Sequence, residues 1–502
     1  MTDSPQVRTI PDSGGQKPHA EGAVFRSTRW NSLGAGCVQL VRLGVSLVLF
    51  DHLGPSDVGL MAMALVVVGF LDWFKDFGTG QAVVQAKTHE PGFLSTVFYV
   101  NLLLAVSLST LIWVLAEPIA WLFDEQRVAD LLPLLGLSFV ITAFGLVQRN
   151  LYARAMRFDR LAFANMINAV VYGVVAIGMA LNDYGVWSMV VGTLVGYMAS
   201  NLSLWFGTSW RPELAFSLEH LNKIKGFCLG LLGSNMANFT LQNMDRVVIG
   251  RFLGTEALGL YALGLRLINF PVRAISRMLM GVLLPAFARL QEDLDIYHAK
   301  FLRACAGITM IVAPMMAGLA ATAPVLVEGF MKPKWLPAVP IIIAMTPLGL
   351  IYSVSGLTGT IYVSLGRTTE LFRWSLIFGL VSLVGYAAGL PWGVFGVACS
   401  ASVTQLLLVY FYFAIPFRMI GLSVSKLATC LAPFILASGV MGTAVVLTRI
   451  GLSAYGFGPK LVCLICVGVG VSLYVGFIWR LRPPALRDLV KLLGVRLHRG
   501  QS

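Results

Sequence analysis

Seven charged residues of this chain lie inside or at the edges of long apolar stretches, where a charge at the centre of a lipid bilayer costs about 2.5 to 3.5 kcal/mol. A charge in such a place needs water, a polar partner or a ligand to solvate it. One carboxylate cannot neutralise so many guanidinium groups, so we expect an excess of positive charge to face a water-filled space. The seven residues are Arg42, Asp245, Arg246, Arg266, Arg273, Arg277 and Arg303.

The spacing of polar residues in these stretches predicts three helices that each carry one polar face. At 100° per residue, offsets of 7 and 11 positions fall within about 20° of one line along a helix. These offsets align Arg266 with Arg273 and Arg277, and Asn235 with Gln242 and Arg246. Asn238 and Asp245 flank the second line, and a third polar face carries Gln39, Arg42 and Ser46.

Guanidinium groups that face water inside a membrane suit an anionic ligand. The planar fork of arginine holds phosphate oxygens in paired hydrogen bonds, so a phosphate or pyrophosphate is the favoured ligand. We predict that its binding residues are Arg42, Arg266, Arg273 and Arg277. The polar face of the cavity would consist of Gln39, Asn235, Asn238 and Gln242, and ion coupling would use Asp245 and Arg246.

The alternative interpretation is that these charged groups pair with one another or extend to the surface of the bilayer. It fits best for Arg246, Arg277 and Arg303, which lie near the ends of their apolar stretches.

The composition of the chain requires a lipid environment. Of its 502 residues, 57% are hydrophobic and only 12% are charged, and the mean hydropathy is +0.78. Soluble domains carry about 25% charged residues, so this composition excludes an ordinary soluble protein. A bilayer core takes about 20 apolar residues per helix, which predicts an all-α integral membrane protein with about fourteen transmembrane helices. The predicted spans are 31–50, 58–74, 93–115, 131–147, 161–181, 185–206, 226–250, 259–284, 301–327, 337–364, 374–390, 393–415, 427–447 and 461–479.

The distribution of basic residues predicts the orientation of these spans. With the N-terminus inside, 25 of the 37 Lys and Arg residues lie on the cytoplasmic side and six lie on the opposite side. Cytoplasmic loops of membrane proteins carry the excess of basic residues, so both termini are predicted to be cytoplasmic. The basic cluster Arg149, Arg154, Arg157 and Arg160 is then expected to contact anionic lipid headgroups rather than nucleic acid.

The pattern L-G-x-x-x-x-G-L occurs twice, at residues 53–60 and 253–260. The interval contains six predicted spans, an even number, so both copies face the same side of the membrane. Parallel repeats characterise transporters whose two halves enclose a central cavity. Chance is the alternative for the motif alone, since Gly-Leu pairs are common in apolar sequences. The predicted organisation is a disordered cytoplasmic tail (1–30), an N-lobe (31–206), a cytoplasmic linker (207–225), a C-lobe (226–415), two further helices (416–480) and a basic cytoplasmic tail (481–502).

The motifs of common enzyme and cofactor-binding classes do not occur in the sequence. It contains no G-x-x-x-x-G-K-[ST], G-x-S-x-G or H-E-x-x-H pattern, and its six histidines are scattered through predicted loops and tails. We therefore predict neither a cofactor nor a metal site. The longest external loop, over residues 116–130, leaves little room for the external domain expected of a membrane polymerase or ligase. The aromatic run at 410–413 is predicted to lie in an interfacial belt.

Several motifs occur together in an order that is specific. They are the first repeat at 53–60, R-A-M-R-F at 154–158, W-R-P at 210–212, D-R-V-V-I-G-R-F-L-G at 245–254 and K-W-L-P at 334–337. From about residue 32 to residue 366, the chain resembles the polysaccharide transporter family. Within it, the chain is similar to Wzx-type oligosaccharide flippases and exopolysaccharide exporters of the multidrug, oligosaccharidyl-lipid and polysaccharide exporter superfamily. One departure is Val58, where the family usually has Phe.

The resemblance implies two six-helix lobes around a central cavity, two extra C-terminal helices and a location in the bacterial inner membrane. It also implies a cargo, a repeat-unit oligosaccharide on undecaprenyl pyrophosphate, which is moved outward by alternating access for exopolysaccharide or lipopolysaccharide assembly. A polysaccharide polymerase and the export machinery are candidate partners beside the bilayer. The alternatives are a lipid II flippase, a drug or ion antiporter, and a membrane polymerase or ligase. An antiporter for cationic drugs predicts more buried carboxylates than arginines, and the sequence has the reverse.

Overall fold

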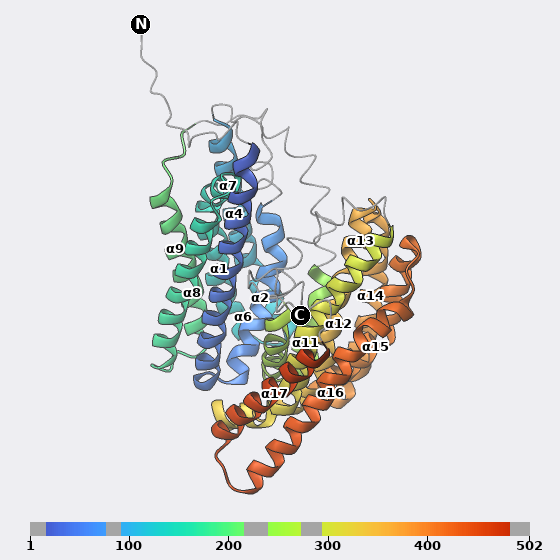
Figure 1. Cartoon of the computed structure of the whole chain (residues 1–502). Helices are drawn as coiled ribbons and strands as arrows, with labels where there is room; N and C mark the ends of the chain where they lie inside the picture. The colour runs from blue at the N-terminus through green and yellow to red at the C-terminus, as the bar shows by residue number, and fades with distance from the viewer. Residues whose placement is uncertain (1–16, 77–91, 215–238, 273–293, 482–502) are drawn as a thin grey trace. The chain divides into compact units, whose positions relative to one another are not determined.

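The computed structural model describes residues 17–76, 92–214, 239–272 and 294–481, and all regular secondary structure in these residues is helical (Figure 1). The predicted all-α class is confirmed. The first half contains α1 (Lys17–His52), α2 (Pro55–Asp76), α4 (Phe93–Val114), α5 (Ala116–Phe123), α6 (Arg127–Phe144), α7 (Leu146–Arg154), α8 (Phe158–Ala180) and α9 (Trp187–Gly207). The second half contains the helical residues 239–272, α11 (Leu294–Phe330), η1 (Pro333–Trp335), α12 (Ala338–Ser355), α13 (Thr358–Ser364), α14 (Thr368–Gly389), η2 (Leu390–Trp392), α15 (Gly393–Ile420), α16 (Val424–Ala454) and α17 (Pro459–Leu481).

The helices agree with the predicted number of spans. Eleven stretches of the described chain are long and apolar enough to cross a membrane. Residues 239–272 would be about 51 Å long as one helix, well beyond a bilayer core, and Gly254 with φ of +81° marks the boundary between two predicted spans there. The stretch Thr368–Ile420 likewise holds two spans, α14 and α15. With α1, the described chain accounts for fourteen spans.

The helix α1 begins earlier than the sequence predicts. It starts at Lys17, whereas the predicted span starts at residue 31, so α1 includes part of the stretch predicted to be a disordered tail. Residues 1–16 and the C-terminal stretch 482–502 lie outside the described residues.

The chain divides into two compact units. The first comprises Met1–Val45, Val67–Glu117 and Ala129–Met236. The second comprises Ser46–Val66, Pro118–Val128 and Ala237–Ser502. The second unit therefore includes two short pieces from the first half of the chain.

The internal repeat extends to a turn that the sequence motif does not cover. In the first unit, α7 ends in a residue with left-handed backbone, Met156 (φ 55°), and the N–H of Arg157 donates to the carbonyl of Tyr152 at 3.0 Å. In the second unit, α13 ends in the same way at Gly366 (φ 70°), and the N–H of Arg367 donates to the carbonyl of Tyr362 at 2.8 Å.

The two turns also share their side-chain contacts, since each arginine pairs with an acid in the first turn of the next helix. Arg157 lies 3.3 Å from Asp159, and Arg367 lies 3.4 Å from Glu370. The same backbone geometry in both units supports a structural repeat rather than a chance recurrence of Gly-Leu pairs.

Close packing in the first unit depends on small residues. The helices α8 and α9 lie side by side in Figure 1 and make extensive contact. A β-carbon on Gly196 of α9 would come within 3.1 Å of the carbonyl oxygen of Asn168 on α8. Helices in a bilayer are held by such close van der Waals contact, because lipid tails are as apolar as the side chains they replace.

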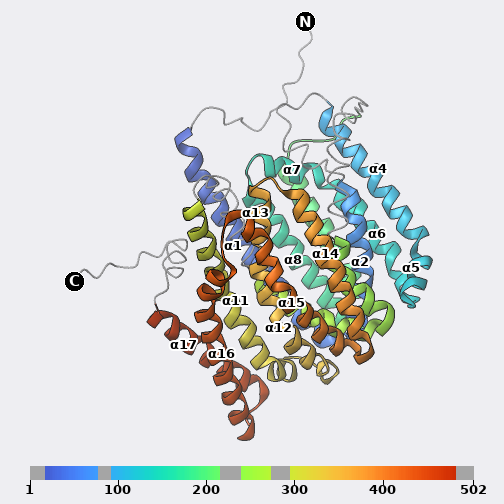
Figure 2. The ribbon, with the colours of Figure 1, turned by 90° about the vertical axis from the view of Figure 1, so that its right-hand side faces the viewer.

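In the second unit, α11, α16 and α17 lie side by side in both views (Figures 1 and 2). Their common cluster includes Met441, Val445 and Cys466, all at most 5% exposed. One polar bond crosses the cluster, from the hydroxyl of Tyr474 to the carbonyl of Met310 at 2.7 Å. The helices of the predicted 416–480 segment are thus packed on α11 and not on one another alone.

Truncation of a residue in this cluster is expected to destabilise the protein. Met441→Ala leaves a cavity among α11, α16 and α17 and should lower the free energy of unfolding by about 2 kcal/mol. The neighbouring Val440 is 68% exposed, so Val440→Ala is the matched control and should have little effect. The measurement is the thermal unfolding midpoint of both variants in detergent. Equal shifts for the two variants would contradict the packing described above.

Candidate functional site

The first predicted ligand-binding arginine, Arg42, lies on α1 in the first unit. Its side chain is exposed, and its Nη2 donates to the amide oxygen of Asn168 on α8 at 3.0 Å. Gln39, about one turn earlier, is half-buried on the same helix. An amide oxygen accepts a hydrogen bond from a guanidinium group without cancelling its charge.

The second predicted arginine, Arg266, lies in the second unit. It is exposed, and its guanidinium carbon is 5.7 Å from the centroid of the Phe50 ring. Phe50 is itself held against Trp335, with ring centroids 5.1 Å apart. A cation over an aromatic face is attracted by the ring quadrupole and keeps its full charge. Arg266 is therefore also positioned by a neutral partner.

Asp245 is nearly buried in the second unit, at 7% exposure. Its Oδ2 accepts a hydrogen bond from the hydroxyl of Tyr261 at 3.0 Å, and its Oδ1 accepts one from the backbone N–H of Arg246 at 2.8 Å. The guanidinium of Arg246 donates instead to the amide of Asn243 at 2.9 Å. The carboxylate is thus hydrogen-bonded to a hydroxyl and a backbone amide.

Further tyrosines surround this carboxylate. Asp245 interacts electrostatically with Tyr352 on α12 and Tyr386 on α14, and these two tyrosines interact with each other. On α15, Tyr412 donates to the amide oxygen of Gln405 at 2.7 Å. The amide nitrogen of Gln405 donates in turn to Ser382 on α14 at 3.0 Å. In the second unit, one carboxylate therefore interacts with hydroxyl groups from its own helical segment, α12 and α14, and a separate set of hydrogen bonds joins α14 to α15.

Sequence reasoning missed these tyrosines. Tyr412 falls in the aromatic run that was predicted to be an interfacial belt, and only part of that run faces outward. Tyr410 and Phe411 are 54% and 49% exposed, whereas Phe413 is 5% exposed and Tyr412 points to Gln405. The belt interpretation is therefore wrong for Tyr412 and Phe413. The occurrence of tyrosines within predicted spans was the available signal, since a buried hydroxyl needs a partner.

Four of the predicted site residues, Arg273, Arg277, Asn235 and Asn238, lie outside the described residues. Gln242 is described and exposed. Arg42 and Arg266 belong to different units, so their convergence on one ligand stays a prediction.

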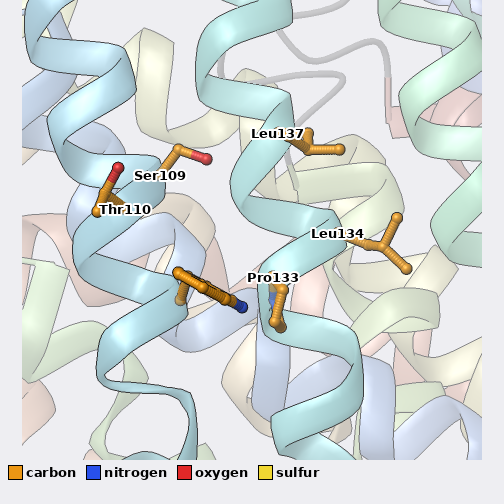
Figure 3. A pocket seen from close by; sticks show the side chains of 6 residues that line it. Ser109, Thr110, Pro133, Leu134 and Leu137 are labelled. Carbon is orange, nitrogen blue, oxygen red and sulfur yellow. The ribbon is translucent and has the colours of Figure 1, made fainter.

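A shallow groove of about 330 Å³ lies between α4 and α6 in the first unit (Figure 3). It is lined by Ser109, Thr110, Trp113, Pro133, Leu134 and Leu137. The hydroxyl of Thr110 donates to a carbonyl of its own helix, and Trp113 is 66% exposed. None of the predicted site residues lines this groove. Among the described residues, no cluster of three His, Cys, Asp or Glu side chains is placed to hold a metal ion.

An ion pair lies in the loop between α5 and α6. Arg127 donates from Nε and Nη2 to the two carboxylate oxygens of Glu125, at 2.8 and 3.0 Å. These hydrogen bonds hold the pKa of Glu125 below its ordinary value of 4.5. In the turn η1 of the second unit, burial and the neighbouring Lys332 lower the pKa of Lys334.

Comparison with known proteins agrees with these observations. The model of a family described as "Polysaccharide biosynthesis protein" matches residues 50–340, more than half of the chain. The chain is 28% identical to the succinoglycan biosynthesis transport protein ExoT of Rhizobium meliloti, over 73% of this chain and 74% of that one. It is 22% identical to the teichuronic acid biosynthesis protein TuaB of Bacillus subtilis, over 94% and 99% of the two chains.

Solved structures with the same fold are transporters. The lipid II flippase MurJ in an inward closed conformation superposes with a TM-score of 0.74 at 16% identity, covering 92% of this chain and 99% of that chain. An inward-facing multidrug resistance transporter of the MATE family, in the MOP superfamily, gives a TM-score of 0.60 at 14% identity over 78% and 96% of the two chains. The resemblance to this superfamily is confirmed at the level of the fold.

Acidification is expected to weaken the ion pair between Glu125 and Arg127. Because the pKa of Glu125 is lowered by folding, its stabilising contribution is complete above about pH 4.3 and is lost as the pH falls through the lowered pKa. We expect the thermal midpoint of the wild type to fall more steeply below pH 4.3 than that of Glu125→Gln. At pH 7 the variant should be slightly less stable. Parallel pH profiles for the two proteins would contradict this assignment.

Proposed function

Because the chain belongs to the polysaccharide biosynthesis protein family, we propose that it is a flippase for undecaprenyl-pyrophosphate-linked oligosaccharide repeat units. It would move them across the bacterial inner membrane for exopolysaccharide or lipopolysaccharide assembly. The observation that carries this proposal is the family match, supported by the relatives named for succinoglycan transport and teichuronic acid biosynthesis and by a fold shared with a lipid II flippase. The activity is transport and not catalysis.

The cargo presents two chemical problems, a pyrophosphate and a hydrated oligosaccharide. Arg42, Arg266, Arg273 and Arg277 would bind the pyrophosphate, because the planar guanidinium group can hold phosphate oxygens in paired hydrogen bonds. Gln39, Asn235, Asn238 and Gln242 would face the sugars, which could not cross hydrocarbon without water or polar partners. The lipid tail of the carrier stays in the bilayer.

Movement would follow alternating access, in which the cavity opens first to the cytoplasm and then to the periplasm. The membrane potential already favours the outward step, because each negative charge that crosses the full field gains about 2.3 kcal/mol per 100 mV. Both termini would be cytoplasmic, in agreement with the excess of basic residues on that side. A polysaccharide polymerase and the export machinery would receive the cargo.

Ion coupling would use Asp245, beside Arg246. A carboxylate hydrogen-bonded to Tyr261 inside a membrane protein can gain or lose a proton or a cation as its surroundings rearrange. Its neighbours Tyr352 and Tyr386 belong to helices α12 and α14, so a change in the charge of Asp245 acts on several helices at once.

Loss of either described arginine should reduce transport. Arg42→Gln and Arg266→Gln each remove charged hydrogen bonds worth about 1.5 to 3 kcal/mol, which corresponds to a loss of about tenfold or more in rate. Lysine at either position should restore part of the rate. The measurement is outward transfer of a defined lipid-linked oligosaccharide in proteoliposomes, with Arg480→Gln at the exposed end of α17 as control.

The same assay separates the alternatives by cargo. Transfer of lipid II but not of the oligosaccharide carrier would favour a lipid II flippase, and export of cationic drugs would favour an antiporter. If both arginine variants transport at the wild-type rate, Arg42 and Arg266 do not bind the pyrophosphate.

Neutralisation of Asp245 should uncouple transport from ion gradients. We expect Asp245→Asn to transport at the same rate with and without an imposed proton or sodium gradient, whereas the wild type should respond to one of them. Tyr261→Phe, which removes the hydrogen bond to the carboxylate, should weaken the response. Asp295→Asn, at an exposed position in the first turn of α11, is the control. An Asp245→Asn variant with an undiminished response would remove Asp245 from the coupling role.

A further inference from the structure

The two copies of the L-G-x-x-x-x-G-L repeat touch each other inside the second unit. A β-carbon added to Gly59 would overlap the carbonyl oxygen of Thr255, and one added to Gly259 would overlap the carbonyl oxygen of Pro55. Pro55 and Thr255 hold equivalent places, four residues before the two glycines. The contact is therefore reciprocal, and each copy uses its glycine to admit the backbone of the other.

Polar contacts surround this crossing. The hydroxyl oxygens of Ser56 and Thr255 are 3.1 Å apart, and Nη2 of Arg127 donates to Ser56 at 3.3 Å. Arg251 forms an ion pair with Asp124 at 3.5 Å. Apart from the bond between Arg127 and Ser56, each of these contacts joins the first half of the chain to the second.

A second group of contacts joins the end of α1 to the turn η1. The indole Nε1 of Trp335 donates to the carbonyl of Phe50, and Nζ of Lys334 donates to the carbonyl of His52 at 3.2 Å. Together with the glycine crossing, these contacts explain why Ser46–Val66 and Pro118–Val128 belong to the second unit. We call the whole set the outer latch, because its loops lie on the side predicted to be periplasmic.

We infer that the outer latch is the periplasmic gate of the transport path, closed in this structure, and that the repeat supplies its two faces. This inference rests on the proposed function and orientation. In alternating access, the outer ends of the two halves must separate once in each cycle. The latch contains the contacts of the second unit that such a separation would break.

Glycine suits a contact that must open and close repeatedly. Two backbones that meet at glycines approach closely, and no side chains interdigitate between them, so separation requires no repacking of rotamers. The polar groups of the latch lie in or next to loops, where water can replace each hydrogen bond after opening. A permanent structural crossing is the competing interpretation, and it predicts that transport continues when the latch is locked.

A disulfide across the crossing tests the gate. Ser56→Cys combined with Thr255→Cys places two thiols where hydroxyl oxygens now lie 3.1 Å apart, within reach of a disulfide. We expect oxidation of this double variant to lower transport of the lipid-linked oligosaccharide at least tenfold, and reduction to restore it. Each single variant, treated identically, controls for the native cysteines. The proposal would be overturned if the disulfide forms and the oxidised protein still transports as fast as the chemically reduced protein. It would also be overturned if the two cysteines do not form a disulfide.

A second measurement requires neither a disulfide nor cargo. Spin labels on non-canonical amino acids at Trp121 and Tyr455, which are 81% and 85% exposed, report the distance between α5 and the C-terminal end of α16, both in the second unit. We expect Gly59→Ala and Gly259→Ala each to shift the distance distribution to longer values, because the added methyl group meets backbone. Gly44→Ala, whose β-carbon would have no neighbour within 4 Å, should leave it unchanged.

If the spin-label distance distributions are identical for the wild type and all three glycine variants, the proposal that the outer latch is the gate is overturned. If the wild type fails to move any lipid-linked oligosaccharide, the proposed function fails, and the distance measurement still decides whether the latch opens.

Discussion

The cost of placing a charge in hydrocarbon is the constraint on which this structure depends. A helix that carries arginine across a bilayer is tolerated only if the group meets water, a polar partner or a ligand. The partners described for Arg42 and Arg266 are an amide and an aromatic face. Each of these two contacts solvates or orients a guanidinium group without placing a carboxylate beside it.

Asp245 is subject to the same cost of placing a charge in hydrocarbon, but its charge is negative. A buried carboxylate could have been neutralised by the adjacent guanidinium of Arg246, yet its described hydrogen bonds come from Tyr261 and from the Arg246 backbone. In the proposed coupling role, hydroxyl and amide donors would stabilise the charge weakly enough for it to be gained and lost. A carboxylate held by an arginine would keep one charge state through the transport cycle, because the pair would have to be broken at each titration.

Hydropathy predicted the fold well because the bilayer imposes one length on every span. The spans needed only local information, and even the two double spans, 239–272 and Thr368–Ile420, were separated correctly by their glycine-containing turns. The residues around Asp245 could not be predicted from the sequence, since Tyr261, Tyr352 and Tyr386 come from separate parts of the chain. Periodicity along one helix cannot show which residues of other helices meet it. Tyr412 was misread for this reason, because the sequence run around it is equally typical of an interface.

The two copies of the repeat share their backbone geometry but differ in their charged side chains. Gly59 and Gly259 are equivalent, and so are the turns at Arg157 and Arg367, because backbone geometry must match wherever the two halves meet or bend alike. Charged side chains are under no such restriction. Asp245 lies within the seventh predicted span, and its counterpart 200 positions earlier is Val45, an apolar residue that packs against Gly173 in the first unit. The two copies therefore match where backbone meets backbone, whereas the ionisable group is present at this position in one copy alone, where it interacts with tyrosines from α12 and α14.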